Sequence, residues 1–392
     1  MSSYIVAGAR TPIGKMSGSL AGLSAADLGG IAIKAALERA GVQPDEVDHV
    51  FMGQVLMAGQ GQVPARQAAA KAGIPLTVPA ANINKVCLSG VNSIYLAHQL
   101  IAAGDADIVV AGGMESMTNA PYIAAGGRAG FRYGNVELAD GIIKDGLFCA
   151  FGNVLMGEST DRDTSSSISR EAQDQFAVTS NVRAAAAAEK GLFDDEMIPV
   201  AIPQRKGDPV MFKTDEGVRA NTTMESLGSL KPAFVKDGTI TAGNASQISD
   251  GGSAVIVMSR AAAEKRGVTP LGEIVSYGMV AGPDTSLLHQ PSNAIKKALA
   301  KINGKVSDID LFELNEAFAA VGIASMKDLG ITDEITNVNG GAIALGHPIG
   351  MSGNRITLAI LHELKRRGGG TGAAALCGGG GQGDAIIVRT VK

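Results

Sequence analysis

The sequence is poor in cysteine, has no cluster of basic residues and has no long apolar run. Only three cysteines occur in 392 residues, and this small odd number argues against a disulfide framework and for a reducing compartment. The net charge is −4 without a block of lysine or arginine, so nothing indicates nucleic-acid binding. No apolar stretch approaches the roughly 20 residues of a membrane span. The first six residues resemble a strand rather than a signal peptide, so we expect a cytoplasmic protein that does not bind membranes.

Glycine, by contrast, is abundant. The chain has 52 glycines, and they gather beside the cysteines and one histidine rather than in linkers. Because glycine lets the backbone come close to a ligand or to another backbone, this pattern indicates tight packing around a site. The length allows roughly two or three domains. A content of 45% hydrophobic and 18% charged residues is ordinary for a chain that buries a large core.

The first part of the chain alternates strands and helices. Ser24 followed by Asp27 is typical of a helix start, and Gly41 is typical of a helix end. The pattern indicates an α/β fold with largely parallel sheets covered by helices. We expect strands over residues 4–9, 48–55, 81–86 and 107–112, and helices over residues 24–40, 62–73 and 88–103.

The second part repeats this order. We expect strands over residues 271–277, 310–314, 372–376 and 384–388, and helices over residues 292–302 and 351–367. The simplest interpretation is a duplicated α/β unit whose first copy carries an insertion of roughly 130 residues before its last strand. The predicted parts are a first half, an insertion and a second half, over residues 1–117 with 250–270, 118–249 and 271–392.

The insertion differs from both halves in composition. It contains a basic loop over residues 126–132, a helix over residues 170–190 and an irregular stretch over residues 199–237. Irregular segments of this length are often functional, although a solvated surface loop fits the charge pattern as well. The irregular stretch carries Lys206, Lys213, Arg219, Lys231 and Lys236.

Two cysteines and one histidine lie in glycine-rich settings. Cys87 is at the start of a predicted helix, where free N–H groups and the helix dipole lower a thiol pKa, as a nucleophile needs. The alternative is a buried small hydrophobic residue. His347 lies between glycines and Pro348, so we expect a side chain presented on a stiff turn before a helix, although a buried structural histidine is the alternative.

The third candidate residue lies at a strand end. Cys377 closes an apolar strand and meets Gly378–Gly381, whose N–H groups are candidates for an oxyanion hole at the carboxyl edge of a sheet, if they do more than make a tight turn. Asn315 and Glu316 follow another strand, as candidates for holding a water or a substrate oxygen. Cys149 has no such setting and is expected to be structural. No CxxC or HxxxH spacing occurs, so zinc is not expected.

With these motifs together, the sequence resembles the thiolase family. The motifs at residues 84–90, 315–318, 339–353 and 376–383 are in the order of that family, and the resemblance spans nearly the whole chain. It implies an α/β fold of five layers, built from a duplicated α/β unit with an inserted loop domain. The similarity is greatest to the short-chain branch, which acts on acetoacetyl-CoA.

The resemblance also implies a role for each motif. Cys87 would be the acyl-accepting nucleophile, His347 its proton acceptor and Cys377 the second acid/base. The N–H groups of Cys87 and Gly379 would hold the thioester oxyanion, and His347 with a water on Asn315 would hold the enolate oxygen. Neither a metal nor a cofactor is implied, because acyl-CoA and coenzyme A are substrate and product.

The insertion resembles the loop domain with which the family holds coenzyme A. Leu155, where the family has a histidine, and residues 158–161 depart from its pattern, which leaves the acyl chain length open. A homotetramer is implied, with the loop at 126–132 bridging dimers. The expected contacts with coenzyme A are Arg219, Ser226, Ser246, Met156, Phe234, Ala317 and Phe318.

Three alternatives remain beside an enzyme for acetoacetyl-CoA. One is a thiolase for longer 3-ketoacyl-CoA in fatty-acid breakdown. Another is a decarboxylating ketoacyl synthase, which works without a second catalytic cysteine, so Cys377 argues against it. The third is a CoA-binding protein without catalysis, which would be expected to lose one of Cys87, His347 and Cys377.

Overall fold

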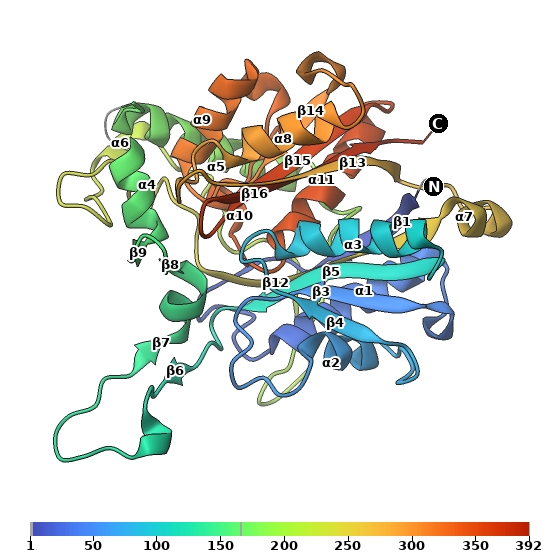
Figure 1. Ribbon diagram of the computed structural model, residues 1–392, viewed down its shortest axis with the longest axis horizontal. Coiled ribbons are helices and arrows are strands. Elements are labelled where there is room, and N and C mark those ends of the chain that lie inside the picture. Colours follow the sequence, from blue (N-terminus) through green and yellow to red (C-terminus); the bar gives the residue numbers. More distant parts are fainter. Residues whose placement is uncertain (1–2, 165–166, 392) are drawn as a thin grey trace.

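A ten-stranded sheet runs through the computed structural model, which describes residues 3–164 and 167–391 of the chain (Figure 1). Its strand order is β4-β3-β5-β12-β1-β13-β16-β15-β14, with β2 (Gly14–Lys15) paired to β12 off this path. The strands of the first half are β1 (Ser3–Arg10), β3 (His49–Gly53), β4 (Ala80–Ile83), β5 (Ile108–Ser116) and β12 (Ser249–Ser259). Those of the second half are β13 (Gly272–Ala281), β14 (Leu311–Leu314), β15 (Thr371–Gly378) and β16 (Gln382–Arg389).

The two halves repeat one topology, as the sequence pattern predicts. The order β3-β5-β12-β1 of the first half corresponds to β14-β15-β16-β13 of the second half. The halves meet at β1 and β13, where, within the part of the chain that the structure describes, only Tyr4 and Ile5 pair with Glu273 and Gly272. Even β4 has a counterpart, because Thr336 forms an isolated parallel bridge with Phe312 of β14.

The prediction of largely parallel sheets is wrong. Only β3 with β4, β3 with β5 and β14 with β15 pair in parallel, whereas the other pairs of the large sheet are antiparallel. The cause is the last strand of each half. β12 and β16 run back beside β5 and β15, and in the second half a short glycine turn makes β15 and β16 a hairpin.

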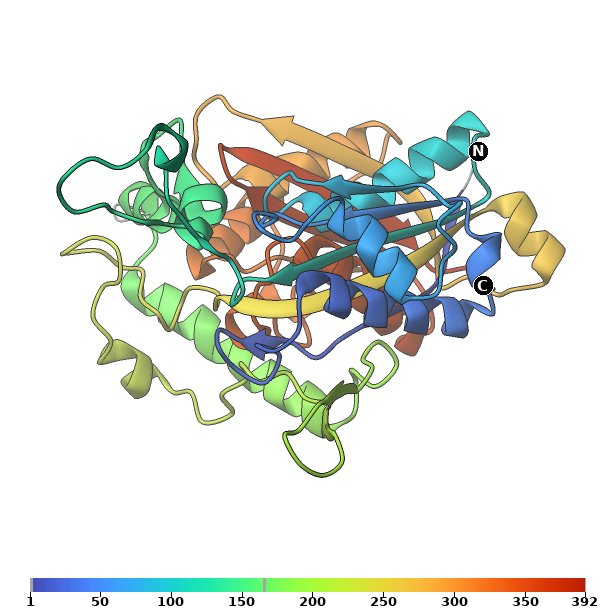
Figure 2. The same ribbon diagram turned by 90° about the horizontal axis from the view of Figure 1, so that it is seen from below.

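Helices and sheet halves alternate in five layers (Figures 1 and 2). Three apolar clusters mark the interfaces: one under the outer helices of the first half, one around the two middle helices and one under α8. The outer helices are α1 (Ala25–Ala40) and α2 (Pro64–Lys71) on the first half and α8 (Gln290–Ala300) and α9 (Ala319–Leu329) on the second half. The middle helices are α3 (Ser89–Ala103) and α11 (Ser352–Arg366).

Local signals set the helix ends. The Ser24 hydroxyl accepts from the Asp27 N–H at 3.2 Å, and the Asp27 carboxylate accepts from the Ser24 N–H at 2.9 Å, which forms a capping box for α1. A cap of this kind contributes about 1 kcal/mol. Gly41, with φ of 63°, ends the helix as predicted.

One apolar stretch corrects the expectation about membrane spans. Among the described residues, Val86–Ala103 has the length and composition of a span, at 18 residues. In this fold the stretch leads into and forms α3, which packs between the two halves of the sheet. Its apolar side chains are therefore part of the core.

The insertion adds short elements and one long helix. The predicted helix is α5 (Arg170–Glu189), and the basic loop lies on an arm that projects from the body between β6 (Tyr122–Ile123) and β7 (Ala139–Asp140) (Figure 1). The remaining elements are η3 (Ile142–Leu147), β8 (Phe148–Cys149), β9 (Val154–Leu155), α4 (Met156–Thr164), β10 (Val200–Ile202), β11 (Val210–Phe212) and α6 (Met224–Gly228).

A buried arginine fastens the insertion to the core. Arg10 at the end of β1 is completely buried, and its guanidinium donates to Glu196 at 2.6 Å and to Asp215 at 2.8 Å. Both acidic residues belong to the insertion. Because a buried charge needs partners, this arrangement holds the two insertion segments against the first half.

Candidate active site

A cavity of about 590 Å³ opens where the insertion meets both halves of the sheet. Cys87, His347 and Cys377, which are far apart in the sequence, all line it. The oxyanion-hole candidate Gly379 lines it as well. The fold therefore brings the two glycine-flanked thiols and the imidazole to one place.

Cys87 lies in the turn between β4 and α3. Val86 before it has φ of 51°, which is unusual for a β-branched residue, and the Ser89 hydroxyl holds the turn by donating to the Val86 carbonyl at 2.6 Å. Burial, with the nearby Glu115 carboxylate, raises the pKa of Cys87 to about 12. The lowering of this pKa that was expected from the helix start is not found, because the thiol is only 5% exposed and desolvation is the largest contribution.

His347 lies between α10 (Ala342–Leu345) and α11. Its Nδ1 is 2.6 Å from the Ser352 hydroxyl, and that hydroxyl donates to the Pro348 carbonyl at 3.1 Å. The network therefore places the proton on Nδ1 and leaves Nε2 as an acceptor, 3.4 Å from the Asn315 amide nitrogen. Burial, and then the Arg355 charge, lower the pKa of His347 to about 3, so the imidazole is neutral.

Cys377 is the second-to-last residue of β15. It is 1% exposed, and burial raises its pKa, with a further contribution from the neighbouring Cys87. The turn that follows contains Gly380 and Gly381 with φ of 77° and 71°, a conformation that favours glycine. Cys149 lies in the apolar cluster that also contains Cys377 and does not line the cavity.

The side chains of Asn315 and Glu316, which follow β14, lie in different surroundings. Asn315 lies behind His347, and its buried side-chain oxygen has no hydrogen-bond partner among the described residues. The Glu316 carboxylate instead accepts from Ser180 at 2.6 Å, from Asn337 at 2.8 Å and from the Ile343 N–H at 3.1 Å. The expectation that this carboxylate would hold a water or a substrate oxygen in the active site is therefore wrong, because it points to α5.

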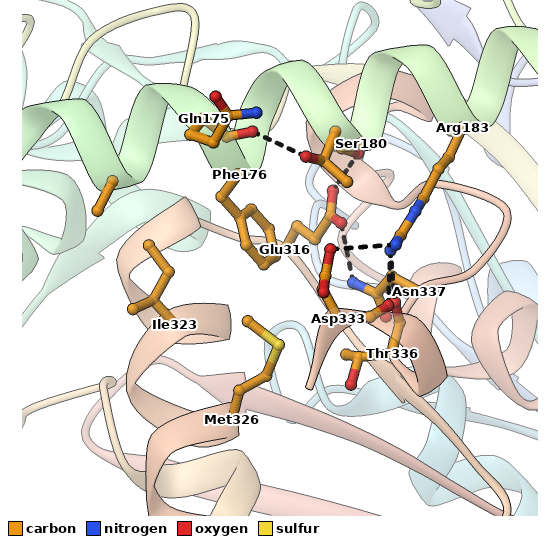
Figure 3. Close-up of a pocket in the computed structure, with 12 residues that line it drawn as sticks. Gln175, Phe176, Ser180, Arg183, Glu316, Ile323, Met326, Asp333, Thr336 and Asn337 are labelled. Atoms are coloured by element: carbon orange, nitrogen blue, oxygen red, sulfur yellow. Dashed lines mark hydrogen bonds and ion pairs between the residues drawn. The ribbon is translucent and has the colours of Figure 1, made fainter. Parts of the chain in front are cut away.

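Glu316 contributes to a separate pocket of about 280 Å³ between α5 and α9 (Figure 3). In Figure 3, Arg183 of α5 turns to Asp333, with which it forms an ion pair of 3.1 Å. Phe176, Ile323 and Met326 make much of the remaining wall. None of the residues of the catalytic cavity lines this pocket.

Most of the expected coenzyme A contacts line the cavity that contains Cys87, His347 and Cys377. Phe234 and Phe318 meet edge to face at 6.1 Å, and a Cβ on Gly157 would lie 2.3 Å from the Phe234 ring. Ser226 does not line the cavity, because its side chain is used in the capping box of α6 with Thr223. The contacts that line it are Arg219, Ser246, Met156, Phe234, Ala317 and Phe318.

Several residues of the cavity wall were not predicted from the sequence. Lys15, the exposed second residue of β2, is, beside Arg219, the second cation of the lining. Gln247 donates to the Gly217 and Ile343 carbonyls at 3.1 Å and so holds the insertion to the turn before His347. Only the position of Gln247 next to Ser246 was a signal. Met16, Met117, Leu147 and Leu287 also line the cavity.

The arrangement suits acyl transfer by thiols and an imidazole that are uncharged before substrate binds. Two thiols and a neutral imidazole line one mostly apolar cavity. A thiol can take an acyl group there if its proton passes to the imidazole, and a second thiol can exchange a proton with a bound carbon acid.

Comparison with known proteins agrees with the geometry. Residues 3–261 match the family model for thiolase, N-terminal domain, and residues 268–390 match thiolase, C-terminal domain. A probable acetyl-CoA acetyltransferase of Mycolicibacterium smegmatis is 58% identical over 98% of this chain and 100% of its own. The acetyl-CoA acetyltransferase of Cupriavidus necator is 53% identical, and that of Pseudomonas aeruginosa is 49% identical, each over 98% of both chains. The chain thus belongs to the thiolase family.

Proposed function

We propose that the protein is an acetyl-CoA C-acetyltransferase, which condenses two molecules of acetyl-CoA to acetoacetyl-CoA and coenzyme A and catalyses the reverse cleavage. The observation that carries the proposal is the meeting of Cys87, His347 and Cys377 in one cavity. Relatives up to 58% identical, named acetyl-CoA acetyltransferase or probable acetyl-CoA acetyltransferase, support the short-chain substrate.

The first step is acyl transfer to Cys87. The Cys87 sulfur attacks the thioester carbonyl carbon, its proton passes to Nε2 of His347, and the bond to the coenzyme A sulfur breaks. Coenzyme A leaves as a thiol with the proton from His347. Because burial disfavours both the thiolate and the imidazolium, the proton moves together with the attack rather than before it.

The second step forms the carbon–carbon bond. Cys377, reacting as its thiolate, removes a proton from the methyl group of a second acetyl-CoA, and the resulting carbon attacks the acetyl carbonyl on Cys87. The bond to the Cys87 sulfur breaks, and that sulfur takes up the proton that Cys377 removed, so both sulfurs end as they began. Burial, which raises the pKa of Cys377, makes its thiolate a strong base. The N–H groups of Cys87 and Gly379 would hold the thioester oxyanion, and His347, when its Nε2 carries a proton, would hold the enolate oxygen together with a water on Asn315.

The insertion, residues 118–249, supplies most of the proposed coenzyme A contacts. Arg219 and Lys15 are the cations of the cavity wall and suit the phosphates, whereas Met156, Ser246 and the two phenylalanines suit the pantetheine arm. No metal or redox cofactor is required, since the steps break and form only C–S, C–C and C–H bonds. Full activity in a chelator is the expected result.

A thiolase for longer 3-ketoacyl-CoA is the second candidate. Leu155 stands in the cavity wall with Leu147, Met156 and Leu287, and bulky side chains around the thiols favour a short acyl group. The deciding experiment compares CoA-dependent cleavage of acetoacetyl-CoA with that of a long-chain 3-ketoacyl-CoA. Faster cleavage of the long chain would refute the proposal. Cys149→Ala is the matched control, because it removes a buried thiol that lies outside the cavity wall.

We also propose a cytoplasmic homotetramer, a dimer of dimers. The arm between β6 and β7 supports this, because it projects from the body with Arg128 and Arg132 on its surface (Figure 1). Phe131 is 52% exposed and Tyr133 is fully exposed, although aromatic side chains are usually covered. Light scattering should give four chains, and replacing residues 126–137 by a short glycine linker should give two. A monomeric wild-type protein would contradict the proposal.

The proposed location in the cytoplasm is supported by three unpaired cysteines, which suit a reducing compartment. Cell fractionation tests the location.

A further inference from the structure

A completely buried carboxylate lies between the chain segments that carry Cys87 and Cys377, without lining the cavity. Asp384 of β16 is 0% exposed, and its two oxygens accept from the Lys85 ammonium at 2.7 and 2.9 Å. The Tyr95 hydroxyl, on a side chain that is also buried, donates to the same carboxylate at 3.0 Å. None of the three residues lines the cavity, so none is placed to touch substrate.

The network joins the segment of one thiol to the strand of the other. Lys85 is two residues before Cys87, and Val86 between them has φ of 51°. Asp384 stands opposite Leu376 in the β15–β16 ladder, one residue before Cys377. Lys85 belongs to the first half and Asp384 to the second, 299 positions apart. The ion pair therefore ties the segment that carries Cys87 to the strand pair that carries Cys377.

Both ends of the network are rigidly held. The Lys85 N–H donates to the Ser89 hydroxyl at 2.8 Å, and that hydroxyl donates to the Val86 carbonyl at 2.6 Å. The Tyr95 ring stacks on Tyr277 of β13 with centroids 4.9 Å apart. A side chain held in this way transmits position, because little conformational freedom remains to absorb a shift.

We propose that Lys85, Asp384 and Tyr95 form a positioning network that sets the place of Cys87 relative to Cys377 for the carbon–carbon step. This inference rests on the proposed function. A largely buried ion pair, here with the Lys85 side chain 20% exposed, adds little net stability compared with an apolar pair of similar size, so fixing one arrangement is a better account of it than stability alone. The acyl-transfer step needs Cys87 with His347, whereas the carbon–carbon step needs both thiols at one methyl group.

The test separates the two steps in the same variants. Acyl transfer is followed alone by exchange of labelled coenzyme A with acetyl-CoA, and the carbon–carbon step is followed by cleavage of acetoacetyl-CoA. Lys85→Met keeps the stem of the side chain and removes its charge. It should lower kcat for cleavage about 10–100-fold, as expected for a displacement near 1 Å, and leave the exchange rate and KM for coenzyme A within about threefold.

Further variants guard against a loss of folding. Tyr95→Phe keeps the stacking and removes one hydrogen bond, and it should lower cleavage in the same selective way by a smaller factor. Lys85→Arg should restore most of the cleavage rate. Lys71→Met is the matched control, because it breaks an exposed 2.7 Å pair with Asp27 on the outer layer, and it should leave both rates unchanged.

The outcomes are distinct. The inference would be overturned if the exchange and cleavage rates of Lys85→Met fell equally, or if Lys85→Met kept the full cleavage rate. It would also be overturned if Lys85→Arg did not recover the cleavage rate. Failure of the proposed function has another signature, which is a wild-type protein that does not cleave acetoacetyl-CoA.

Discussion

The reactivity of Cys87 toward an alkylating agent separates two physical accounts of its thiol. A pKa of about 12 against an ordinary 9.0 leaves about 1,000-fold less thiolate near pH 8 than an unperturbed cysteine has. A more basic thiolate is intrinsically about 20-fold more nucleophilic over this range. The two factors together predict alkylation about 50-fold slower than that of a solvated thiol, before any steric hindrance from burial.

The assay uses the Cys377→Ala variant, so that Cys87 is the remaining thiol of the cavity wall. Iodoacetamide labelling is measured by peptide mass spectrometry between about pH 7 and pH 9.5. A free peptide of residues 84–90 serves as the reference. The logarithm of the rate should rise by about one per pH unit throughout, because the pKa lies above the range. A plateau below about pH 8.5, or a rate at pH 8 that equals that of the peptide, would show that the helix terminus controls the thiol and would refute the burial argument.

Three further predictions concern roles and pH. Cys87→Ala should leave no acetyl-enzyme, whereas Cys377→Ala should still be acetylated by acetyl-CoA on Cys87 and should fail at condensation. Mass spectrometry of each variant tests this, and an acetyl group on Cys377 in the wild type would reverse the roles. Arg219→Ala should raise KM for acyl-CoA with little change in kcat. Lys206→Ala, outside the cavity wall, should change neither constant. A fall of kcat alone in Arg219→Ala would contradict the assignment of Arg219 to coenzyme A binding. Burial raises the pKa of Glu115 to about 7 from 4.5, so its contribution to stability is full below pH 4.5 and is lost as the pH rises through 7. Glu115→Gln should therefore remove about 3 kcal/mol of pH dependence in urea unfolding at fixed protein concentration, and parallel curves for variant and wild type would contradict this.

Local sequence signals predicted the helices and the topology of the repeat well. Ser24 and Gly41 bound α1 as predicted, and the repeated pattern of strands and helices indicated the two equivalent halves. The direction of the strands could not be predicted from such local signals. An alternating pattern looks alike whether the last strand of a unit runs parallel or returns beside its neighbour, and the insertion separates β5 from β12 so that no hairpin turn marks the return.

The candidate site was predicted as a set of residues but not in its electrostatics. Glycine-rich turns identified Cys87, His347 and Cys377, which line one cavity. The pKa of Cys87 depends on how deeply the helix start is buried and on Glu115, and neither follows from the local sequence. The same limit applies to Glu316, because the neighbour that decides its direction is Ser180, which is 136 positions away.

The duplication explains how Cys87 and His347 come together. The equivalent middle helices α3 and α11 both begin with Ser-Gly, and Cys87 and His347 lie in the turns just before these helices. The two helix starts cross closely: a Cβ on Gly90 would lie 2.7 Å from the Asn354 nitrogen, and one on Gly353 would lie 2.4 Å from the Val91 nitrogen.

The serines next to these glycines act alike in the two copies. Ser89 donates to the carbonyl of Val86 at 2.6 Å, and Ser352 donates to the carbonyl of Pro348 at 3.1 Å, so each serine pins the turn before its own helix. In the second copy the serine has an additional partner, the His347 ring, at 2.6 Å. One repeated Ser-Gly helix start thus supplies the crossing point and the anchors of both turns, and the two copies differ in the side chain that the turn presents. In the proposed mechanism the copy that presents a thiol supplies the nucleophile, and the copy that presents an imidazole, bonded to its serine, supplies the base.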